Sequence, residues 1–342
     1  MSFEYIRKLP TPDEIREEFP FPAHLTELKK KRDEEIRKVL TGESNKFLVI
    51  IGPCSADNED SVCDYVSRLA RINEDVKDRL ILIPRIYTNK PRTTGEGYKG
   101  IVHQPNPEQK PDFLSGLIAM RKMHIRAVEE SGLTAADEML YPENWGYVSD
   151  LLSYVAIGAR SVEDQQHRIV VSGFDIPAGM KNPTGGDLTV MMNSITAGQH
   201  QHDFIANGYE VKTDGNPLTH AILRGSVNRH GNNIPNYHYE DLTRVAYMYE
   251  KFQLKNPAVI VDANHSNSGK QWDQQPRIVQ EVLHSRSFLP EIKSLVKGIM
   301  IESYIEDGNQ SIGNGVYGQS ITDPCLGWDK SAALLYRMAD YI

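Results

Sequence analysis

The segment Phe47–Gly52 reads FLVIIG, an unbroken apolar run that leads directly into Pro53 and Cys54. A strand covered on both faces is apolar throughout instead of alternating, so this run predicts a buried strand of a parallel sheet. Seven further short apolar runs recur along the chain. They are LILIPRI (Leu80–Ile86), TAADEM (Thr134–Met139), YVAIGAR (Tyr154–Arg160), IPAGMKN (Ile176–Asn182), HAILRG (His220–Gly225), AVIVDANH (Ala258–His265) and GIMIESY (Gly298–Tyr304).

Segments with helical periodicity lie between these runs. Asn58–Arg71 begins with an asparagine cap and places Val62, Val66 and Leu69 on one face. Residues 239–251 and 278–283 carry similar apolar stripes. Strands that alternate with helices form parallel sheets, and eight such units fit an α/β fold, the closed (β/α)8 barrel (TIM barrel) of typically about 250 residues.

The chain is longer than a barrel needs, and the surplus lies in two places. Residues 1–46 are predicted to form an N-terminal extension with a helix over Ala23–Leu40, before a barrel domain over residues 47–342. An insertion near residues 200–216 contains Phe204–Val211, in which Asn207 and Gly208 form a two-residue hairpin turn. These decorations either carry regulation and subunit contacts or are an N-terminal clamp and a surface hairpin.

Composition excludes several classes of protein. The 342 residues carry a net charge of −8, which is unfavourable for a general nucleic-acid or anionic-membrane binder. Three cysteines without CxxC spacing indicate neither a disulfide framework nor a zinc ribbon, and they suit a reducing compartment. Apolar runs are too short to span a bilayer, and the N-terminus lacks a signal-peptide core. We expect a cytoplasmic protein with no nucleic-acid or membrane partner.

Each of the eight runs ends in, or is closely followed by, a side chain that can do chemistry. In a (β/α)8 enzyme the carboxyl ends of the strands open into one mouth, where the active site lies. One charged residue after a strand carries little information, but a complete set predicts convergence on one site. In chain order the set is Cys54, Arg85, Glu138, Arg160, Lys181, Arg224, His265 and Glu302.

Cations dominate this set, and KPRTT (Lys90–Thr94) adds two more. Several cations around one cavity repel one another unless anions are present, and arginine forks match phosphate and carboxylate geometry. The pattern predicts a small, multiply anionic ligand with more than one phosphate, although each arginine could instead pair with a surface carboxylate. The six cations are Arg85, Lys90, Arg92, Arg160, Lys181 and Arg224.

A second group contains Cys54, His265 and Glu302, with Asp323 as a fourth member. A thiolate, an imidazole and two carboxylates suit a divalent transition metal such as manganese, iron, cobalt or zinc. The mixture is too hard for an all-cysteine zinc site and too soft for calcium. The alternatives remain that Cys54 is a small buried residue and that His265 is bonded to backbone.

Eight longer motifs appear in order: IGPCS (Ile51–Ser55), KPRTT (Lys90–Thr94), AIGARS (Ala156–Ser161), GMKNPTGG (Gly179–Gly186), ILRGS (Ile222–Ser226), DANHSNSGKQ (Asp262–Gln271), IESYIEDGNQ (Ile301–Gln310) and GQSITDPCLGW (Gly318–Trp328). Together they closely resemble type I 3-deoxy-D-arabino-heptulosonate 7-phosphate (DAHP) synthases of the feedback-regulated bacterial and fungal kind. The resemblance runs over essentially the whole chain.

This resemblance implies a metal-dependent transferase that condenses phosphoenolpyruvate with erythrose 4-phosphate, the first step of the shikimate route to aromatic amino acids. It implies a divalent metal, most simply Mn²⁺, on Cys54, His265, Glu302 and Asp323. It also implies a homodimer or homotetramer. The implied phosphoenolpyruvate contacts are Arg85, Lys90, Arg160, Lys181 and Arg224. The implied erythrose 4-phosphate contacts are Arg92, Thr93 and Asp323. Glu138 and His167 are further implied active-site residues, and Lys90 is a candidate proton donor.

Three alternatives stay open. The sister 3-deoxy-D-manno-octulosonate 8-phosphate synthase uses arabinose 5-phosphate, but it carries a KANRSS-like motif where this chain has KPRTT. A non-catalytic barrel that binds a small molecule would have lost a metal ligand or a phosphate clamp. A Schiff-base aldolase could use Lys181 but needs only one phosphate clamp. In the resembled family the hairpin and N-terminal segment form the feedback site, so we also expect inhibition by an aromatic amino acid; the shorter hairpin here leaves its identity open.

Overall fold

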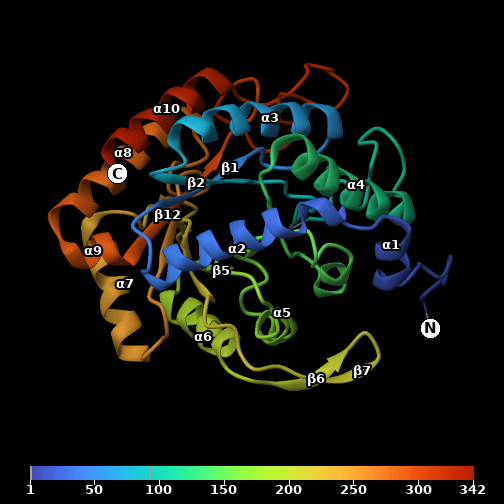
Figure 1. Cartoon of the computed structure of the whole chain (residues 1–342), viewed down its shortest axis with the longest axis horizontal. Coiled ribbons are helices and arrows are strands. Elements are labelled where there is room, and N and C mark those ends of the chain that lie inside the picture. Colours follow the sequence, from blue (N-terminus) through green and yellow to red (C-terminus); the bar gives the residue numbers. More distant parts are fainter. Residues whose placement is uncertain (1, 93) are drawn as a thin grey trace.

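The computed structural model describes residues 2–92 and 94–342, and it forms an eight-stranded parallel barrel wrapped by helices (Figure 1). The barrel strands are β1 (Phe47–Gly52), β2 (Leu80–Pro84), β3 (Ala136–Glu138), β4 (Tyr154–Ile157), β5 (Ala178–Lys181), β8 (His220–Leu223), β11 (Val259–Asp262) and β12 (Val296–Glu302). Each lies within or overlaps one of the eight apolar runs, so the predicted fold class is confirmed.

The spatial order of the strands is β2-β1-β12-β11-β8-β5-β4-β3. The sheet closes where β2 meets β3, because the Ile86 amide donates to the Ala136 carbonyl over 2.9 Å and Arg85 forms a parallel bridge with Ala136. Within the sheet, the first barrel strand, β1, pairs with the last, β12, and Gly52 stands opposite Glu302 in the register.

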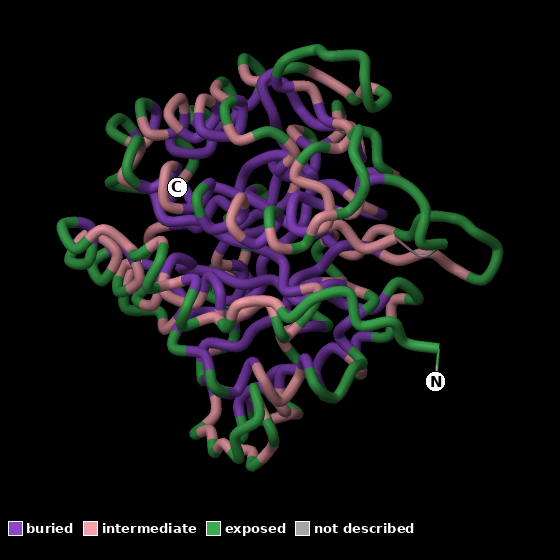
Figure 2. The backbone as a smooth tube through the Cα atoms, turned by 90° about the vertical axis from the view of Figure 1, so that its right-hand side faces the viewer, coloured by how far each residue is buried: buried purple, intermediate pink, exposed green. Residues whose placement is uncertain are grey.

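The helices cover the outside of the barrel (Figure 1), and Figure 2 shows buried chain gathered at the centre with exposed chain around it. Asn58 caps the helix after β1 as expected, since its side chain accepts a hydrogen bond from the Ser61 amide. The α-helices are α1 (Pro12–Glu18), α2 (Thr26–Thr41), α3 (Glu59–Val76), α4 (Phe113–Ser131), α5 (Gln165–Val171), α6 (Leu188–Gln199), α7 (Tyr239–Phe252), α8 (Gln275–Phe288), α9 (Pro290–Leu295) and α10 (Trp328–Tyr341).

Helix α2 closes the amino-terminal end of the barrel. Its buried residues Ile36, Val39 and Leu40 belong to the same apolar cluster as interior side chains such as Leu48 and Ile260. The burial of these side chains fixes the extension against the strands and leaves the opposite end as the open mouth. The predicted helix is therefore present, preceded by a short 3-10 turn over Ala23–Leu25, whereas α1 was not predicted. The division of the chain at residue 46 stays a prediction.

The predicted hairpin is also present, as β6 (Asp203–Ala206) and β7 (Tyr209–Lys212), which extend away from the barrel (Figure 1). Asn207 and Gly208 both have positive φ, at 50° and 81°, as a two-residue turn of this type requires. A second short hairpin, β9 (Ser226–Val227) with β10 (Asn233–Ile234), was not predicted. Among the described residues, no helix is long and apolar enough to cross a membrane.

Candidate active site

A cavity of about 270 Å³ opens at the carboxyl ends of the barrel strands. All six predicted cations line it, together with Cys54, Glu138, His265 and Asp323. Lys270 is a further cation of the lining, which the sequence analysis did not single out. The barrel thus brings together residues that lie far apart in the sequence.

The glycine before Cys54 is required by the close approach of β1 to the chain beyond β2. A Cβ atom on Gly52 would lie 2.3 Å from the Arg85 carbonyl oxygen, which is a severe clash. The Arg85 side chain turns back to the same turn, where Nη1 donates to the Pro53 carbonyl over 2.6 Å. These contacts hold Cys54 at the mouth, and its side chain is buried.

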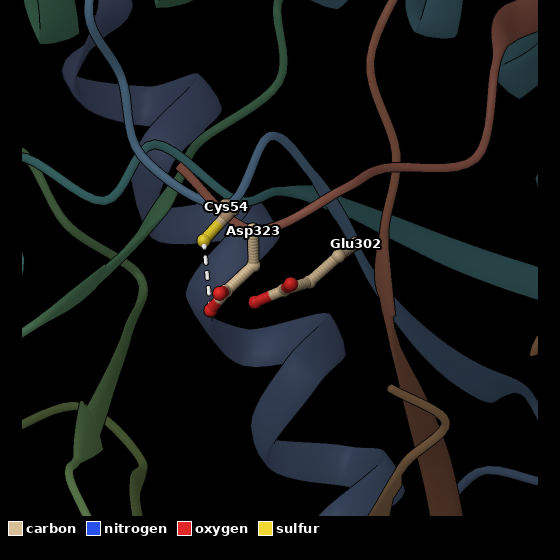
Figure 3. A group of neighbouring side chains, drawn as sticks. All are labelled: Cys54, Glu302 and Asp323. Atoms are coloured by element: carbon tan, nitrogen blue, oxygen red, sulfur yellow. Dashed lines mark hydrogen bonds between the residues drawn. The ribbon is translucent and has the colours of Figure 1, made fainter. Parts of the chain in front are cut away.

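Cys54, Glu302 and Asp323 point toward one another from three segments (Figure 3). Each offers one ligand atom, and the three atoms all lie within 4.8 Å of one another. Glu302 ends β12, and Asp323 belongs to the loop between β12 and α10. Ser55 ties this loop to the turn after β1, because its hydroxyl lies 2.9 Å from that of Thr322. The loop is therefore held over the strand ends.

His265 stands beside this group. Its Nε2 lies 3.8 Å from Glu302 Oε1, and its Nδ1 lies 2.7 Å from Asp262 Oδ2. A histidine whose Nδ1 is held by a carboxylate presents Nε2 to a metal. The residue has a φ of 40°, an uncommon conformation that Lys270 helps to hold by donating its amide to the His265 carbonyl over 2.8 Å.

Two lysines neutralise the acidic end of this group. Lys90 Nζ lies 2.7 Å from Cys54 Sγ and 2.9 Å from Asp323 Oδ2, and Lys270 Nζ lies 2.9 Å from Asp323 Oδ1. Burial opposes ionisation of Asp323, but the two lysines hold its pKa well below the ordinary value. Burial, followed by the negative charge of Glu302, raises the pKa of the Cys54 thiol.

The donor set fits a divalent transition metal. Glu302 Oε1 is buried and has no hydrogen-bond partner among the described residues, although Arg85 Nη2 lies 2.9 Å away. Its other oxygen accepts from Asn264 Nδ2 over 2.5 Å. A buried carboxylate oxygen that is ion-paired but accepts no hydrogen bond, next to a thiol, a second carboxylate and an oriented imidazole, is an arrangement that a metal ion would complete.

The floor of the cavity pairs cations with carboxylates. Lys181 Nζ lies 2.8 Å from Glu138 Oε2, and both side chains are buried. Burial opposes ionisation of Glu138, but Lys181, and then Arg85 and His265, lower its pKa. The expectation that only bound anions would offset the cations is therefore too simple. Nor are these carboxylates on the surface, where the alternative interpretation placed them.

Cationic groups of the lining nevertheless outnumber its carboxylates. Arg224 Nη1 is buried without a hydrogen-bond partner among the described residues, and burial lowers the pKa of this guanidinium. The excess positive charge and the orphaned donor suit an anion with at least one phosphate.

Three of the predicted site residues are not part of the described cavity lining. Glu302 is 1% exposed and lies beneath the lining. His167 is not part of the lining: its Nδ1 lies 2.6 Å from Asp164 Oδ2 and its Nε2 lies 2.9 Å from the Leu140 carbonyl oxygen. Its catalytic role stays a prediction. Thr93 falls outside the described residues.

Sequence reasoning missed Lys270 and Asp262, which contact the predicted metal ligands directly. Both lie within the motif DANHSNSGKQ, and Asp262 ends its strand. The spacing Asp-x-x-His at a strand end was the available signal for an oriented histidine.

The chain is similar to proteins of one family. The model of the DAHP synthetase I family matches residues 22–336. The phospho-2-dehydro-3-deoxyheptonate aldolase, Phe-sensitive, of Escherichia coli K12 is 35% identical over 100% of this chain and 97% of its own length. The Tyr-sensitive protein of the same organism is 34% identical over 96% of this chain and 91% of its own length.

A solved structure agrees with these sequence matches. The phospho-2-dehydro-3-deoxyheptonate aldolase of Francisella tularensis SCHU S4 superposes with a TM-score of 0.92 and 27% identity, covering 100% of this chain and 98% of that one. Family model, full-length relatives and barrel thus point the same way, and this chain belongs to the DAHP synthetase I family.

Proposed function

We propose that this chain condenses phosphoenolpyruvate with D-erythrose 4-phosphate and water, giving 3-deoxy-D-arabino-heptulosonate 7-phosphate and phosphate. The observation that carries the proposal is the single cavity in which cations for two phosphates and a carboxylate adjoin the group Cys54, Glu302 and Asp323. Family membership supports the same reaction.

The cations divide between the two substrates. Arg85, Lys90, Arg160, Lys181 and Arg224 would hold the phosphate and carboxylate of phosphoenolpyruvate. Arg92, at the rim, would hold the phosphate of the aldehyde substrate with Thr93, while Asp323 would contact its sugar part; Arg92 is oriented because its Nε donates to the Tyr98 carbonyl over 2.8 Å. Cations on both phosphates would bring C3 of phosphoenolpyruvate near the aldehyde carbon and lower the entropic cost of the encounter.

Cys54, His265, Glu302 and Asp323 would hold a divalent metal, with Mn²⁺ as the first choice and Fe²⁺, Co²⁺ or Zn²⁺ as alternatives. When bound there, the metal supplies Lewis-acid polarisation of the aldehyde oxygen. Glu138, kept ionised by Lys181, places a negative charge near the site where positive charge develops at C2 of phosphoenolpyruvate.

Asp262 is expected to position His265, and Asp262→Asn tests this. Losing the carboxylate weakens the hold on Nδ1, so metal affinity should fall by about 10–100-fold while turnover recovers at saturating Mn²⁺. Titration against a competing chelator measures the affinity. Unchanged affinity together with a lower melting temperature would instead assign Asp262 a purely structural part.

Lys90 is expected to donate a proton to the alkoxide that forms from the aldehyde, because its ammonium lies against Cys54 and Asp323. Lys90→Met should lower kcat by at least about 100-fold while phosphoenolpyruvate still binds through the remaining cations. Single-turnover kinetics and a phosphoenolpyruvate titration separate the two effects. Near-normal kcat would contradict the role.

Consumption of phosphoenolpyruvate tests the proposed reaction. The protein is stripped with a chelator, assayed with erythrose 4-phosphate, and assayed again after Mn²⁺ is restored, with arabinose 5-phosphate in parallel. We expect metal-dependent turnover of the four-carbon sugar alone. Turnover of the five-carbon sugar would assign the sister reaction, and no turnover of either with metal bound would favour a binding protein.

Feedback inhibition by an aromatic amino acid is the regulatory part of the proposal. The N-terminal segment and the hairpin base both contact the stretch between residues 142 and 174: the Tyr147 hydroxyl donates to the Pro10 carbonyl over 2.7 Å, and the Thr213 hydroxyl lies 2.6 Å from that of Ser172. We expect at least one of phenylalanine, tyrosine and tryptophan to inhibit turnover in a dose-response assay. A flat response to all three would refute it.

We also propose that the chain forms a homodimer or homotetramer, as the family resemblance implies. Phe3, Tyr5 and Ile6 are 81%, 91% and 89% exposed, and Ile205 and Tyr209 of the hairpin are 78% and 73% exposed. Apolar side chains this exposed, on the N-terminal segment and on the hairpin, would be covered by another subunit.

A further inference from the structure

A second cationic cavity lies at the opposite end of the barrel from the mouth. It measures about 380 Å³ and is formed by the turn after α2, the ends of α8 and α9, and the start of β12. We call it the basal cavity. Four cations line it, Lys46, Arg286, Lys293 and Lys297, and no carboxylate belongs to its lining among the described residues. It shares no residue with the cavity at the mouth.

Arg286 is the unusual member of this group, because its side chain is buried without a polar partner. The residue is 8% exposed, and its Nε is buried with no hydrogen-bond partner among the described residues. Its guanidinium stacks on the Phe47 ring, 4.4 Å from the centroid. Burial lowers its pKa to about 10.

A buried guanidinium nitrogen without an acceptor is costly, so the barrel base carries Arg286 at the expense of stability. The second cation, Lys297, adds to the cost, since burial and then Arg286 lower its pKa. The carboxyl ends of α2 and α8 offset part of the repulsion through their helix dipoles, but they leave Nε of Arg286 without a hydrogen bond. An anion in the cavity would meet both needs.

We propose that the basal cavity binds a small phosphate-bearing anion. The planar fork of Arg286 matches two phosphate oxygens, and the three lysines supply point charges around a dianion. The volume leaves room for more than a bare phosphate, so a phosphorylated metabolite or a diphosphate fits better than a halide or a single carboxylate.

The position of the cavity gives such a ligand a structural effect. Lys46 directly precedes β1, and Lys297 lies at the start of β12. These two strands are hydrogen-bonded neighbours. An anion held between the amino-terminal ends of the first and the last barrel strands would stabilise the pairing whose far end carries Cys54 and Glu302. Anion binding in the basal cavity is independent of which reaction the mouth catalyses.

Calorimetry with inorganic phosphate and with diphosphate tests the proposal, using the full chain and three variants. Arg286→Met removes the basal fork, and Arg224→Met removes a cation of the mouth. Arg337→Met, at an exposed position of α10, is the control for loss of one positive charge. We expect two classes of anion site in the parent. In Arg286→Met we expect one class, because the affinity of the basal cavity falls by about tenfold or more. Arg224→Met should weaken only the other class.

Thermal unfolding gives an independent measurement. In phosphate-free buffer Arg286→Met should melt at or above the parent temperature, because an unpartnered buried charge has been replaced by an apolar side chain of similar length. Added diphosphate should raise the melting temperature of the parent and of Arg337→Met more than that of Arg286→Met. Without added anion, the turnover of Arg286→Met should equal that of the parent. Lys297→Gln provides a second, milder variant with the same expected direction.

Two results would overturn the proposal. One is equal stoichiometry and affinity for both anions in the parent and Arg286→Met. The other is a change of oligomeric state in Arg286→Met without any loss of anion binding, which would assign the cations to contact with an acidic segment of a second copy.

Discussion

Replacing Cys54 with alanine should abolish stoichiometric Mn²⁺ binding and lower kcat by at least about a thousandfold. The thiol would be the soft ligand of the proposed metal site, and the other two members of the group, Glu302 and Asp323, offer only carboxylate oxygens. Loss of several kcal/mol of charge stabilisation at the aldehyde accounts for the size of the effect. Metal content after dialysis and steady-state turnover measure it.

Cys63→Ala is the matched control for this experiment. Cys63 is also fully buried, but it lies within α3, and burial raises its pKa to about 12. Its loss should leave metal content and kcat unchanged and cost about 1 kcal/mol of stability at most. Stoichiometric metal in Cys54→Ala with kcat within tenfold of the parent would remove the thiol from the proposed metal site.

Lys181→Met should reduce both stability and activity. Lys181 and Glu138 are 2% and 6% exposed, so removing the ammonium leaves a buried carboxylate without its main partner. Breaking such a pair costs roughly 3–5 kcal/mol of unfolding free energy. Phosphoenolpyruvate should also bind more weakly, because a cation of the mouth is lost. Urea unfolding and a substrate titration measure the two effects.

The pH dependence of the unfolding free energy identifies the cause of the stability loss in Lys181→Met. In the parent, Lys181 holds the pKa of Glu138 below 4.5, so this carboxylate contributes stability above that pH and loses it as the pH falls. In Lys181→Met, burial becomes dominant and raises this pKa, so the deficit should grow as the pH rises from 4 to 8.

The double variant Lys181→Met with Glu138→Gln separates stability from function. Replacing both partners removes the unpaired charge, so most of the lost stability should return while turnover stays low. If the deficit of the double variant equals that of the single one, packing rather than charge is responsible.

Much of the fold follows from the sequence because parallel strands buried on both faces are written as continuous apolar runs. FLVIIG coincides with β1, and in Ala258–His265 the strand itself is shorter, at Val259–Asp262. The predicted run extends beyond the strand because it also includes residues that follow the strand, and composition alone does not show where the strand ends. The turn at Asn207-Gly208 was predictable because positive φ at both positions favours that pair.

The ion pairs inside the mouth could not be predicted from the sequence, because they depend on how deeply each side chain lies in the barrel. Sequence order places Arg85 and Glu302 at strand ends but does not reveal that they form an ion pair beneath the cavity. Nor does it reveal that Glu138 sits against Lys181, or that the side chain of His167 is held between Asp164 and a backbone carbonyl. Such contacts are set by the twist and closure of the barrel, which no local pattern encodes.

The pairing of the first barrel strand with the last also sets when the chain can become active during its synthesis. A ribosome-bound chain that ends before β12 already has Cys54, yet it lacks both Glu302 and Asp323. Contacts between residues this far apart in sequence form late, because the intervening loop must first be ordered. The nascent protein therefore cannot assemble the proposed metal-binding group early, and completion of translation, closure of the barrel and assembly of this group become one event.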